Sequence, residues 1–218
     1  MKKKKIKSLI FGISGQDGSY LSHFLINKGY DVCGTTRNSS KNNLKNLVRL
    51  GILKKVKIIK CNIIDFLGVK KLIKTIKPDE IYYLCGKSSV VQSFTNPVDS
   101  FKSNTLGLLN ILDTVKKTNK KIKVFNAVSG QFYGNKNNNV YNEKSYIDPQ
   151  SPYGVSKASS FWLTKIFREW YGIKCCSGIL FNHESPLRSN EFVTKKIINC
   201  SKLIKKGKLK HLYLGNIN

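Results

Sequence analysis

An apolar stretch that runs straight into a glycine-rich turn is the feature that most constrains the fold of this chain. Residues 6–12 (IKSLIFG) have the pattern of a buried strand, and the turn GISGQDG follows, with glycines at positions 12, 15 and 18. An amphipathic stretch then indicates a helix that begins near Ser19. A strand, a glycine-rich turn and a helix N-terminus in this order bind the pyrophosphate of a dinucleotide. Without that context, the same glycines would indicate only a flexible loop.

Strand-like and helix-like patterns alternate along most of the chain. The expected strands are residues 6–12, 30–36, 55–61, 80–86, 123–129 and 174–181, and the expected helices are residues 20–29, 69–77, 104–118 and 156–172. This alternation predicts an α/β fold, a doubly wound parallel sheet of the Rossmann type. After Phe181 the alternation loosens into a helix at 192–206 and a strand-like end from 211. We therefore expect a dinucleotide-binding domain over residues 1–181 and the start of a second region over residues 182–218.

The composition argues against several classes of protein. The net charge is +27, but the lysines are scattered and accompany no RNP, zinc-finger or helix-turn-helix signature, so we do not expect a nucleic-acid partner. No apolar run approaches the roughly 18–20 residues that span a bilayer. Six cysteines without a Cys-x-x-Cys pair, and only three histidines, predict free thiols and no metal site. We expect a cytoplasmic protein.

The end of the second strand suggests which dinucleotide binds. It reads TTRNSS, and Arg37 stands where an NAD site usually carries an acid for the ribose hydroxyls. A guanidinium suits the 2′-phosphate of NADP, so NADP is the expected cofactor. An arginine that is merely solvated is the alternative.

A Tyr-x-x-x-Lys pair supplies candidate redox residues. Tyr153 and Lys157 lie four apart at the start of a helical stretch, so they share one face. A phenol with a pKa of about 10 needs a neighbouring cation to act as a base near neutrality, and the lysine can also hold the nicotinamide ribose. Tyr83 and Lys87 have the same spacing but end a strand, where positions four apart are separated by about 13 Å. The turn SPYG before the helix favours Tyr153 and Lys157.

Three stretches of this sequence resemble one family closely. GISGQDGSYL (12–21), SPYGVSKASSFW (151–162) and GILFNHESPLRSNEFVTKKI (178–197) are similar to the GDP-mannose 4,6-dehydratases, which are extended short-chain dehydrogenases. The resemblance implies an enzyme with tightly bound NADP. It also implies a three-step reaction on GDP-mannose: oxidation at C4, loss of water across C5 and C6, and return of the hydride to C6. The product would be GDP-4-keto-6-deoxy-mannose.

The resemblance also implies roles for individual residues. Those expected to bind the cofactor are Gly12, Gly15, Gln16, Asp17, Gly18, Arg37, Asn62, Ile63, Leu84, Gly86, Ser88, Lys157, His183 and Arg188. Those expected to bind the substrate are Ser88, Ser129, Asn182 and Lys196. Those expected to be catalytic are Ser129, Gln131, Tyr153 and Lys157. At Asn62 and Ile63 the family has an Asp-Leu pair near the adenine, so the acid is missing here.

A second departure lies in the stretch VSGQFYG (128–134), which matches Ser-Thr-Ser-Glu-Leu-Tyr-Gly in the family. Ser129 replaces the threonine and keeps a hydroxyl that can bond the sugar's 4-oxygen. Gln131 replaces the glutamate expected to remove the C5 proton and to assist loss of the C6 hydroxyl. An amide can only hydrogen-bond there, and losing a general base typically costs about 10²–10⁴ in rate. The hydride step needs Tyr153, Lys157 and NADP, and it would survive.

Three readings of the function stay open. The first is a GDP-mannose 4,6-dehydratase that acts on GDP-mannose or a related GDP-sugar. The second is an NADP-dependent sugar-nucleotide reductase or epimerase, which tolerates an amide at position 131. The third is a non-catalytic paralogue that binds NADP. The family continues past the LGN at residues 214–216, so we expect an incomplete sugar-nucleotide region, and we expect a homo-oligomer, either a dimer or a tetramer.

Overall fold

The computed structural model describes residues 4–40, 42–134 and 140–214. It divides into two compact units, Met1–Phe181 and Asn182–Asn218, and each is described by itself. In the described residues, no helix is both long enough and apolar enough to span a membrane. The functional division of the chain at residue 181 stays a prediction.

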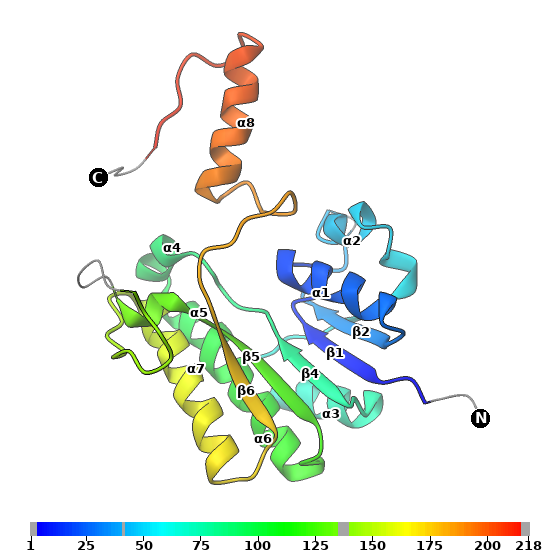
Figure 1. Cartoon of the computed structure of the whole chain (residues 1–218). Coiled ribbons are helices and arrows are strands. Elements are labelled where there is room, and N and C mark those ends of the chain that lie inside the picture. The colour runs from blue at the N-terminus through cyan, green and yellow to red at the C-terminus, as the bar shows by residue number, and fades with distance from the viewer. Residues whose placement is uncertain (1–3, 41, 135–139, 215–218) are drawn as a thin grey trace. The chain divides into compact units, whose positions relative to one another are not determined.

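The first unit is built on a six-stranded sheet in which every neighbouring pair is parallel (Figure 1). The spatial order is β3-β2-β1-β4-β5-β6. The strands are β1 (Lys7–Phe11), β2 (Asp31–Thr36), β3 (Lys57–Lys60), β4 (Glu80–Tyr83), β5 (Lys123–Ser129) and β6 (Cys175–Leu180). The predicted doubly wound α/β fold is thus confirmed, and each expected strand is present.

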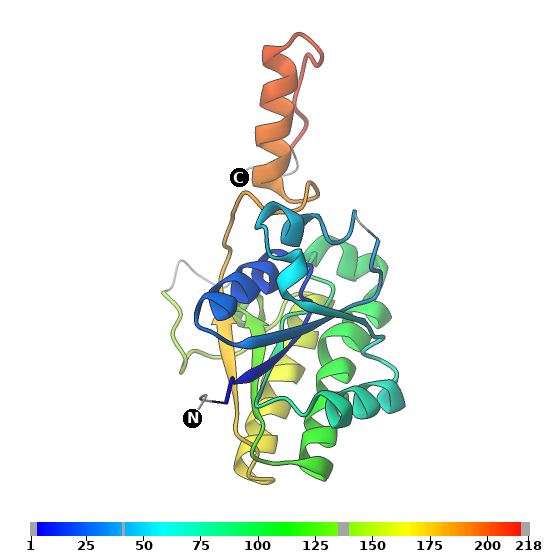
Figure 2. The ribbon, with the colours of Figure 1, turned by 90° about the vertical axis from the view of Figure 1, so that its right-hand side faces the viewer.

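Helices cover the sheet on both sides (Figures 1 and 2). The longer ones are α1 (Gln16–Asn27), α3 (Phe66–Ile76), α6 (Gly107–Thr118) and α7 (Pro152–Glu169). The shorter ones are α2 (Lys45–Arg49), α4 (Val90–Thr95), α5 (Pro97–Phe101), the 3₁₀ turns η1 (Leu53–Lys55) and η3 (Gly130–Tyr133), and the π-helical segment η2 (Lys102–Leu106).

The alternation of side chains along β1 explains why helices cover both faces of the sheet. Ile10 packs with Leu25 of α1 and Leu47 of α2 in one buried cluster. Its neighbours along the strand, Leu9 and Phe11, point to the other face and join the cluster built on α3, α6 and α7. Successive side chains of a strand point to opposite faces, so an uninterrupted apolar strand is a strand covered on both sides.

The order of the strands fixes where a ligand can bind. β1 pairs with β2 on one side and with β4 on the other, so the direction of winding reverses between β1 and β4. In open α/β sheets, ligands bind beyond the carboxyl ends of the strands at this reversal. The glycine-rich turn follows β1 and residues 84–88 follow β4, so both lie at this point.

Several boundaries differ from the predictions. β4 ends at Tyr83, short of the expected end, and Gly86 then turns the chain with φ +142°. The expected helix at 104–118 is divided into η2 and α6. The strand expected from residue 211 is wrong for residues 211–214, which have no regular structure, and residues 215–218 lie outside the described part.

The second unit contains one described helix, α8 (Val193–Lys205), which matches the helix expected at 192–206. Arg188 forms an ion pair of 3.3 Å with Glu184, and its guanidinium lies 3.4 Å from the centre of the Phe192 ring. The ammonium of Lys196 donates a hydrogen bond of 2.6 Å to the backbone oxygen of Tyr213.

Candidate active site

The glycine-rich turn has the shape that a pyrophosphate requires. Gly12 has φ +92°, and a Cβ there would lie 2.9 Å from the backbone of Cys85. A Cβ on Gly18 would overlap the carbonyl oxygen of Gly12. Gly15 is the N-cap of α1, and no described side chain caps the helix there. The turn therefore brings bare backbone and a helix N-terminus to one point, which fits a bound diphosphate.

Arg37 lies directly after β2, exposed, at the place predicted for the adenosine phosphate. Asn43, which sequence reasoning missed, organises the loop around it. Its amide donates to the hydroxyl of Thr36 at 2.6 Å and to the hydroxyl of Ser14 at 3.3 Å. The loop after β2 is thereby tied to the glycine-rich turn, and no motif in the sequence pointed to this link.

The residues expected near the adenine follow β3. The side-chain oxygen of Asn62 accepts from the backbone N–H of Ile64 at 3.2 Å, and the side chain of Asn62 is exposed. Ile63 is 8% exposed and joins the hydrophobic core. Its backbone oxygen accepts from Asn110 at 2.8 Å. A contact of Ile63 with a cofactor would therefore be made by its backbone.

Residues 84–88 leave β4 beside the glycine-rich turn. The backbone N–H of Leu84 donates to the oxygen of Phe11 at 3.0 Å, and the loop then exposes Gly86 and Ser88. Burial raises the pKa of the Cys85 thiol to about 12, although the nearby Lys157 lowers it. Cys85 is therefore a neutral thiol at physiological pH.

Tyr153 and Lys157 lie in the first turns of α7. Ser151 caps this helix by accepting from the backbone N–H of Gly154 at 3.0 Å, and Tyr153 and Lys157 are each 7% exposed. The ammonium of Lys157 donates to the backbone oxygen of Ala127 at 2.9 Å. It lies 5.8 Å from the centre of the Tyr153 ring. The structure thus places the lysine cation beside the phenol, as the spacing predicts.

Tyr83 and Lys87 have the same spacing as Tyr153 and Lys157, but the surroundings of Tyr83 argue against it as the redox phenol. The ring of Tyr83 is fully buried in the core, and its hydroxyl donates to the backbone oxygen of Ser103. Burial also raises the pKa of this phenol well above its ordinary value. Tyr83 is therefore a core residue, which leaves Tyr153 as the candidate redox phenol.

Ser129 and Gln131 sit where β5 meets η3, next to the start of α7. The hydroxyl of Ser129 accepts from the backbone N–H of Gln131 at 3.3 Å, and the side chain of Gln131 is exposed. The backbone oxygen of Gln131 packs so tightly against Gly154 that a Cβ there would lie 2.8 Å away. The structure therefore brings Ser129, Gln131 and Tyr153 together.

The remaining predicted residues belong to the second unit. Asn182 and His183 are exposed, while the side chains of Arg188 and Lys196 are engaged with Glu184 and with the backbone of Tyr213. Their expected roles toward the cofactor and the substrate stay predictions.

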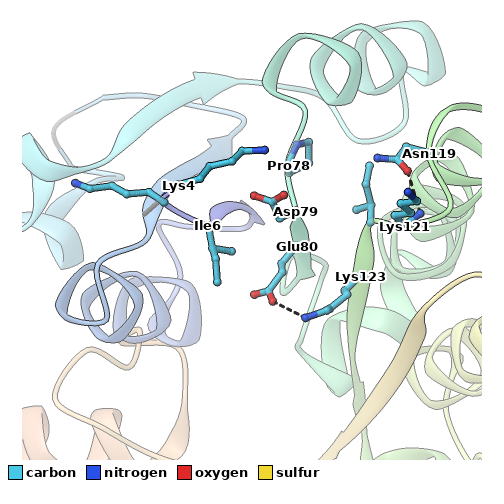
Figure 3. Close-up of a pocket in the computed structure, with 10 residues that line it drawn as sticks. Lys4, Ile6, Pro78, Asp79, Glu80, Asn119, Lys121 and Lys123 are labelled. Carbon is cyan, nitrogen blue, oxygen red and sulfur yellow. Dashed lines mark hydrogen bonds and ion pairs between the residues drawn. The ribbon is translucent and has the colours of Figure 1, made fainter. Parts of the chain in front are cut away.

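A hollow of about 350 Å³ lies elsewhere, beside the amino ends of β1, β4 and β5 (Figure 3). Both of its carboxylates are engaged by neighbouring groups. Asp79 accepts from the backbone N–H of Lys7 at 2.8 Å, and Glu80 pairs with Lys123 at 3.2 Å. Since parallel strands place their catalytic loops at the carboxyl ends, this hollow is on the wrong edge for the site. In the described residues, no cluster of His, Cys, Asp and Glu could hold a metal ion.

Comparison with protein families shows which family this chain belongs to. A family model described as GDP-mannose 4,6 dehydratase matches residues 9–218. The chain belongs to the GDP-mannose 4,6-dehydratase family. The resemblance seen in the sequence motifs is thus confirmed over nearly the whole chain.

Members of the family are similar throughout this chain. The GDP-mannose 4,6-dehydratase of Vibrio cholerae is 38% identical over 225 residues, which cover 99% of this chain and 59% of that protein. GDP-mannose 4,6 dehydratase 1 of Arabidopsis thaliana is 38% identical over 227 residues, which cover 100% of this chain and 62% of that protein. The chain therefore spans less than two thirds of the length of these relatives.

Solved structures share the fold at lower identity. The UDP-glucose 4-epimerase of Thermus thermophilus, solved with NAD, matches with a TM-score of 0.80 and 23% identity, over 93% of this chain and 63% of that one. The dTDP-glucose 4,6-dehydratase of Bacillus anthracis, also solved with NAD, matches with a TM-score of 0.78 and 20% identity, over 93% of this chain and 62% of that one. Both likenesses agree with the Rossmann fold.

Proposed function

We propose that this protein acts as a GDP-mannose 4,6-dehydratase and uses NADP to convert GDP-mannose to GDP-4-keto-6-deoxy-mannose. The observation that carries the proposal is the pairing of Tyr153 with the buried ammonium of Lys157 on α7, a helix that begins beside Ser129 and Gln131. The names of the relatives support the choice of GDP-mannose.

The cofactor proposal rests on the glycine-rich turn and on Arg37. The turn offers bare backbone and an uncapped helix N-terminus to a diphosphate. The exposed guanidinium of Arg37 favours a 2′-phosphate and hence NADP, whereas the two structural neighbours named above were solved with NAD. When bound, the nicotinamide accepts a hydride from the sugar and later returns it.

The residues of the chain have separate roles in the first step. Tyr153, as phenolate, takes the proton of the 4-hydroxyl while C4 is oxidised. Lys157 stabilises that phenolate by its charge, and its bond to Ala127 holds the charge in place. The Ser129 hydroxyl lies at the end of β5, where it can bond the 4-oxygen of the sugar.

Water loss is the step in which this chain differs from the family pattern. Removing the C5 proton needs a base, and the amide of Gln131 cannot accept a proton at neutral pH. We therefore expect slow elimination by this chain. The same observation favours a second candidate, a sugar-nucleotide reductase or epimerase, because hydride exchange at C4 needs Tyr153 and Lys157 but no base at position 131.

We further propose that the protein is a cytoplasmic homo-oligomer. Its cysteines are free, which suits a reducing compartment. Four apolar residues on α7 and its C-cap are between 42% and 79% exposed and recur at helical spacing: Val155, Trp162, Ile166 and Trp170. Exposed apolar stripes of this kind mark interaction surfaces, and a second copy can cover the stripe with an identical one.

The experiment that tests the function is incubation of the purified protein with GDP-mannose and NADP, followed by mass analysis of the nucleotide sugar. Loss of one water is the expected result. A product of unchanged mass, with no net change in NADP, would favour the epimerase, and a product lighter by two hydrogens, with NADP reduced to NADPH, would favour the reductase. Binding of NADP without any change in the sugar would contradict both enzymatic readings and favour the non-catalytic paralogue.

A further inference from the structure

Two neighbouring side chains of η2 hold the loop that follows β4. The hydroxyl of Ser103 accepts from the backbone N–H of Lys87 at 3.1 Å. The amide of Asn104 donates to the backbone oxygen of the same residue at 3.0 Å. Both backbone polar groups of Lys87, its N–H and its carbonyl oxygen, are therefore fixed by adjacent side chains of one segment.

The side-chain oxygen of Asn104 packs closely against the same loop. Its side-chain oxygen is buried, has no hydrogen-bond partner among the described residues, and faces Gly86. A Cβ on Gly86 would overlap that oxygen, and Gly86 has φ +142°, a conformation that side chains rarely adopt. The loop can therefore pass over Asn104 in this way only with glycine at position 86.

The next residue of η2 reaches the opposite side of the site. The hydroxyl of Thr105 donates to the backbone oxygen of Ser156 at 2.9 Å, and both residues are buried. Ser156 directly precedes Lys157 on α7 and lies three residues after Tyr153. Ser103, Asn104 and Thr105 thus connect the loop beside the glycine-rich turn with the helix that carries the redox pair.

The backbone of this segment departs from a regular helix. η2 is π-helical, between the α-helical segments α5 and α6. Single π turns inside helices are rare and occur frequently at functional sites. Here the π turn is the segment whose side chains bind two other parts of the site.

We propose that Ser103, Asn104 and Thr105 form a positioning brace, which sets the distance between residues 84–88 and the Tyr153–Lys157 pair. None of the three is assigned a contact with the substrate. The consequence for hydride transfer rests on the function proposed above, whereas the brace itself is a property of the fold.

Thr105→Val is the sharpest test, because valine keeps the shape of threonine and removes the hydroxyl. Thr114→Val is the matched control. Thr114 is also fully buried, but its hydroxyl donates to Asn110 within its own helix at 2.7 Å. We expect Thr105→Val to lower kcat for hydride transfer from GDP-mannose at least tenfold, with KM and the Kd for NADP changed less than twofold. Thr105→Ser, which restores the hydroxyl, should recover most of kcat.

Asn104→Ala tests the other end of the brace. Releasing the loop should raise the Kd for NADP about tenfold, measured by the fluorescence of bound NADPH, whereas Thr105→Val should leave that Kd unchanged. An Asn104→Ala variant with wild-type NADP affinity would contradict the loop half of the proposal.

A third readout needs neither cofactor nor turnover. Burial lowers the pKa of Lys157 to about 8, so its ¹³Cε resonance titrates apart from those of exposed lysines and can be assigned by its loss in Lys157→Arg. If the brace holds α7, Thr105→Val shifts this pKa by half a unit or more and Thr114→Val does not. A shift in a protein that performs no hydride transfer would support the brace and refute the proposed function. Unchanged pKa and kcat in Thr105→Val would overturn the brace.

Discussion

The ammonium of Lys157 donates a 2.9 Å hydrogen bond to the backbone oxygen of Ala127, which lies in β5 two residues before Ser129. The lysine is 7% exposed, and burial lowers its pKa to about 8, although the nearby Cys85 raises it. A lysine on a helix is thereby anchored to the strand that ends at Ser129, and Gln131 follows in η3. The anchor holds a cation where water is largely excluded.

This burial predicts how stability changes with pH. The folded-state pKa of Lys157 lies near 8 and the unfolded value near 10.5. Between these values the unfolded chain binds more protons, so the free energy of unfolding rises with pH across that window. Below pH 8 both states carry the proton, and the cost of the buried charge is constant. The full rise is on the order of 3 kcal/mol, at about 1.4 kcal/mol per pKa unit.

Lys157→Met isolates the effect, because methionine fills the space without a charge. Urea unfolding of both proteins from pH 7 to pH 10.5 should show the wild-type protein gaining stability relative to the variant. Groups that do not interact with Lys157 titrate alike in both proteins, so they cancel in the difference. A difference that stays constant over this range would mean that Lys157 is solvated.

The second prediction concerns Gln131. Its side chain is exposed, so Gln131→Glu should change the free energy of unfolding by less than about 0.5 kcal/mol. A carboxylate at this position can accept the C5 proton. The rate of water loss from GDP-mannose, followed by product mass, should therefore rise by about 10²–10⁴.

Gln150→Glu is the control for charge alone, since Gln150 is also exposed and its amide donates to the backbone of Asp148. It should leave the rate of water loss unchanged. If Gln131→Glu produces no acceleration while the wild-type protein eliminates water at the same rate, the amide is tolerated and another group removes the proton.

The fold was predictable because its strands are apolar runs with clear ends. β1 and β5 are buried on both faces, and polar or glycine-containing turns follow them. Short helices such as α4 carry too few residues for a periodic pattern. Their place is set by tertiary contacts, as in the bond from the backbone N–H of Tyr153 to the Ser93 hydroxyl at 3.1 Å.

The residues of the candidate site also fall into two groups, those that a sequence motif reveals and those that only the folded structure reveals. Residues within motifs, such as Gly12 and Tyr153, could be named from the sequence because spacing along one segment reveals them. Residues that act through other residues could not. Thr105 bonds a residue 51 positions away, and Asn43 bonds Ser14. Such pairs become neighbours only when the parallel strands bring their carboxyl ends together.

The third prediction separates NADP from NAD. If Arg37 binds the 2′-phosphate, Arg37→Met should weaken NADP binding by about 10–100-fold, since a hydrogen bond to a charged group is worth roughly 1.5–3 kcal/mol. NAD binding should not change. Arg49→Met removes another exposed arginine, from α2, and should affect neither cofactor. Equal effects of the two variants would show that Arg37 acts only through net charge.

The fourth prediction concerns the apolar stripe on α7. Trp162 and Ile166 are 47% and 42% exposed, one helical turn apart. Placing a charge between two copies is costly, so Trp162→Glu should reduce the oligomer to monomers in sedimentation experiments. Leu67→Glu makes a comparable change at a residue that is 71% exposed on α3, and it should leave the mass of the assembly unchanged. A wild-type protein that sediments as a monomer would refute the oligomer.

The last prediction compares two glycines that share a backbone conformation but differ in their neighbours. Gly12 has φ +92° and Gly29 has φ +82°, so alanine is strained at both, by about 1–2 kcal/mol. A Cβ on Gly29 meets nothing within 4 Å, whereas one on Gly12 lies 2.9 Å from Cys85. Gly12→Ala should therefore lower the melting temperature more than Gly29→Ala does.

The same pair of variants tests the dinucleotide turn. Gly12→Ala pushes β1 and the start of the β4 loop apart at the reversal of the sheet, so NADP binding should fall by at least tenfold. Gly29→Ala lies at the far end of α1 and should keep wild-type affinity despite its strain. Isothermal titration calorimetry of both variants with NADP measures these affinities. Retained NADP affinity in a folded Gly12→Ala protein would mean that the cofactor does not approach the backbone at this turn.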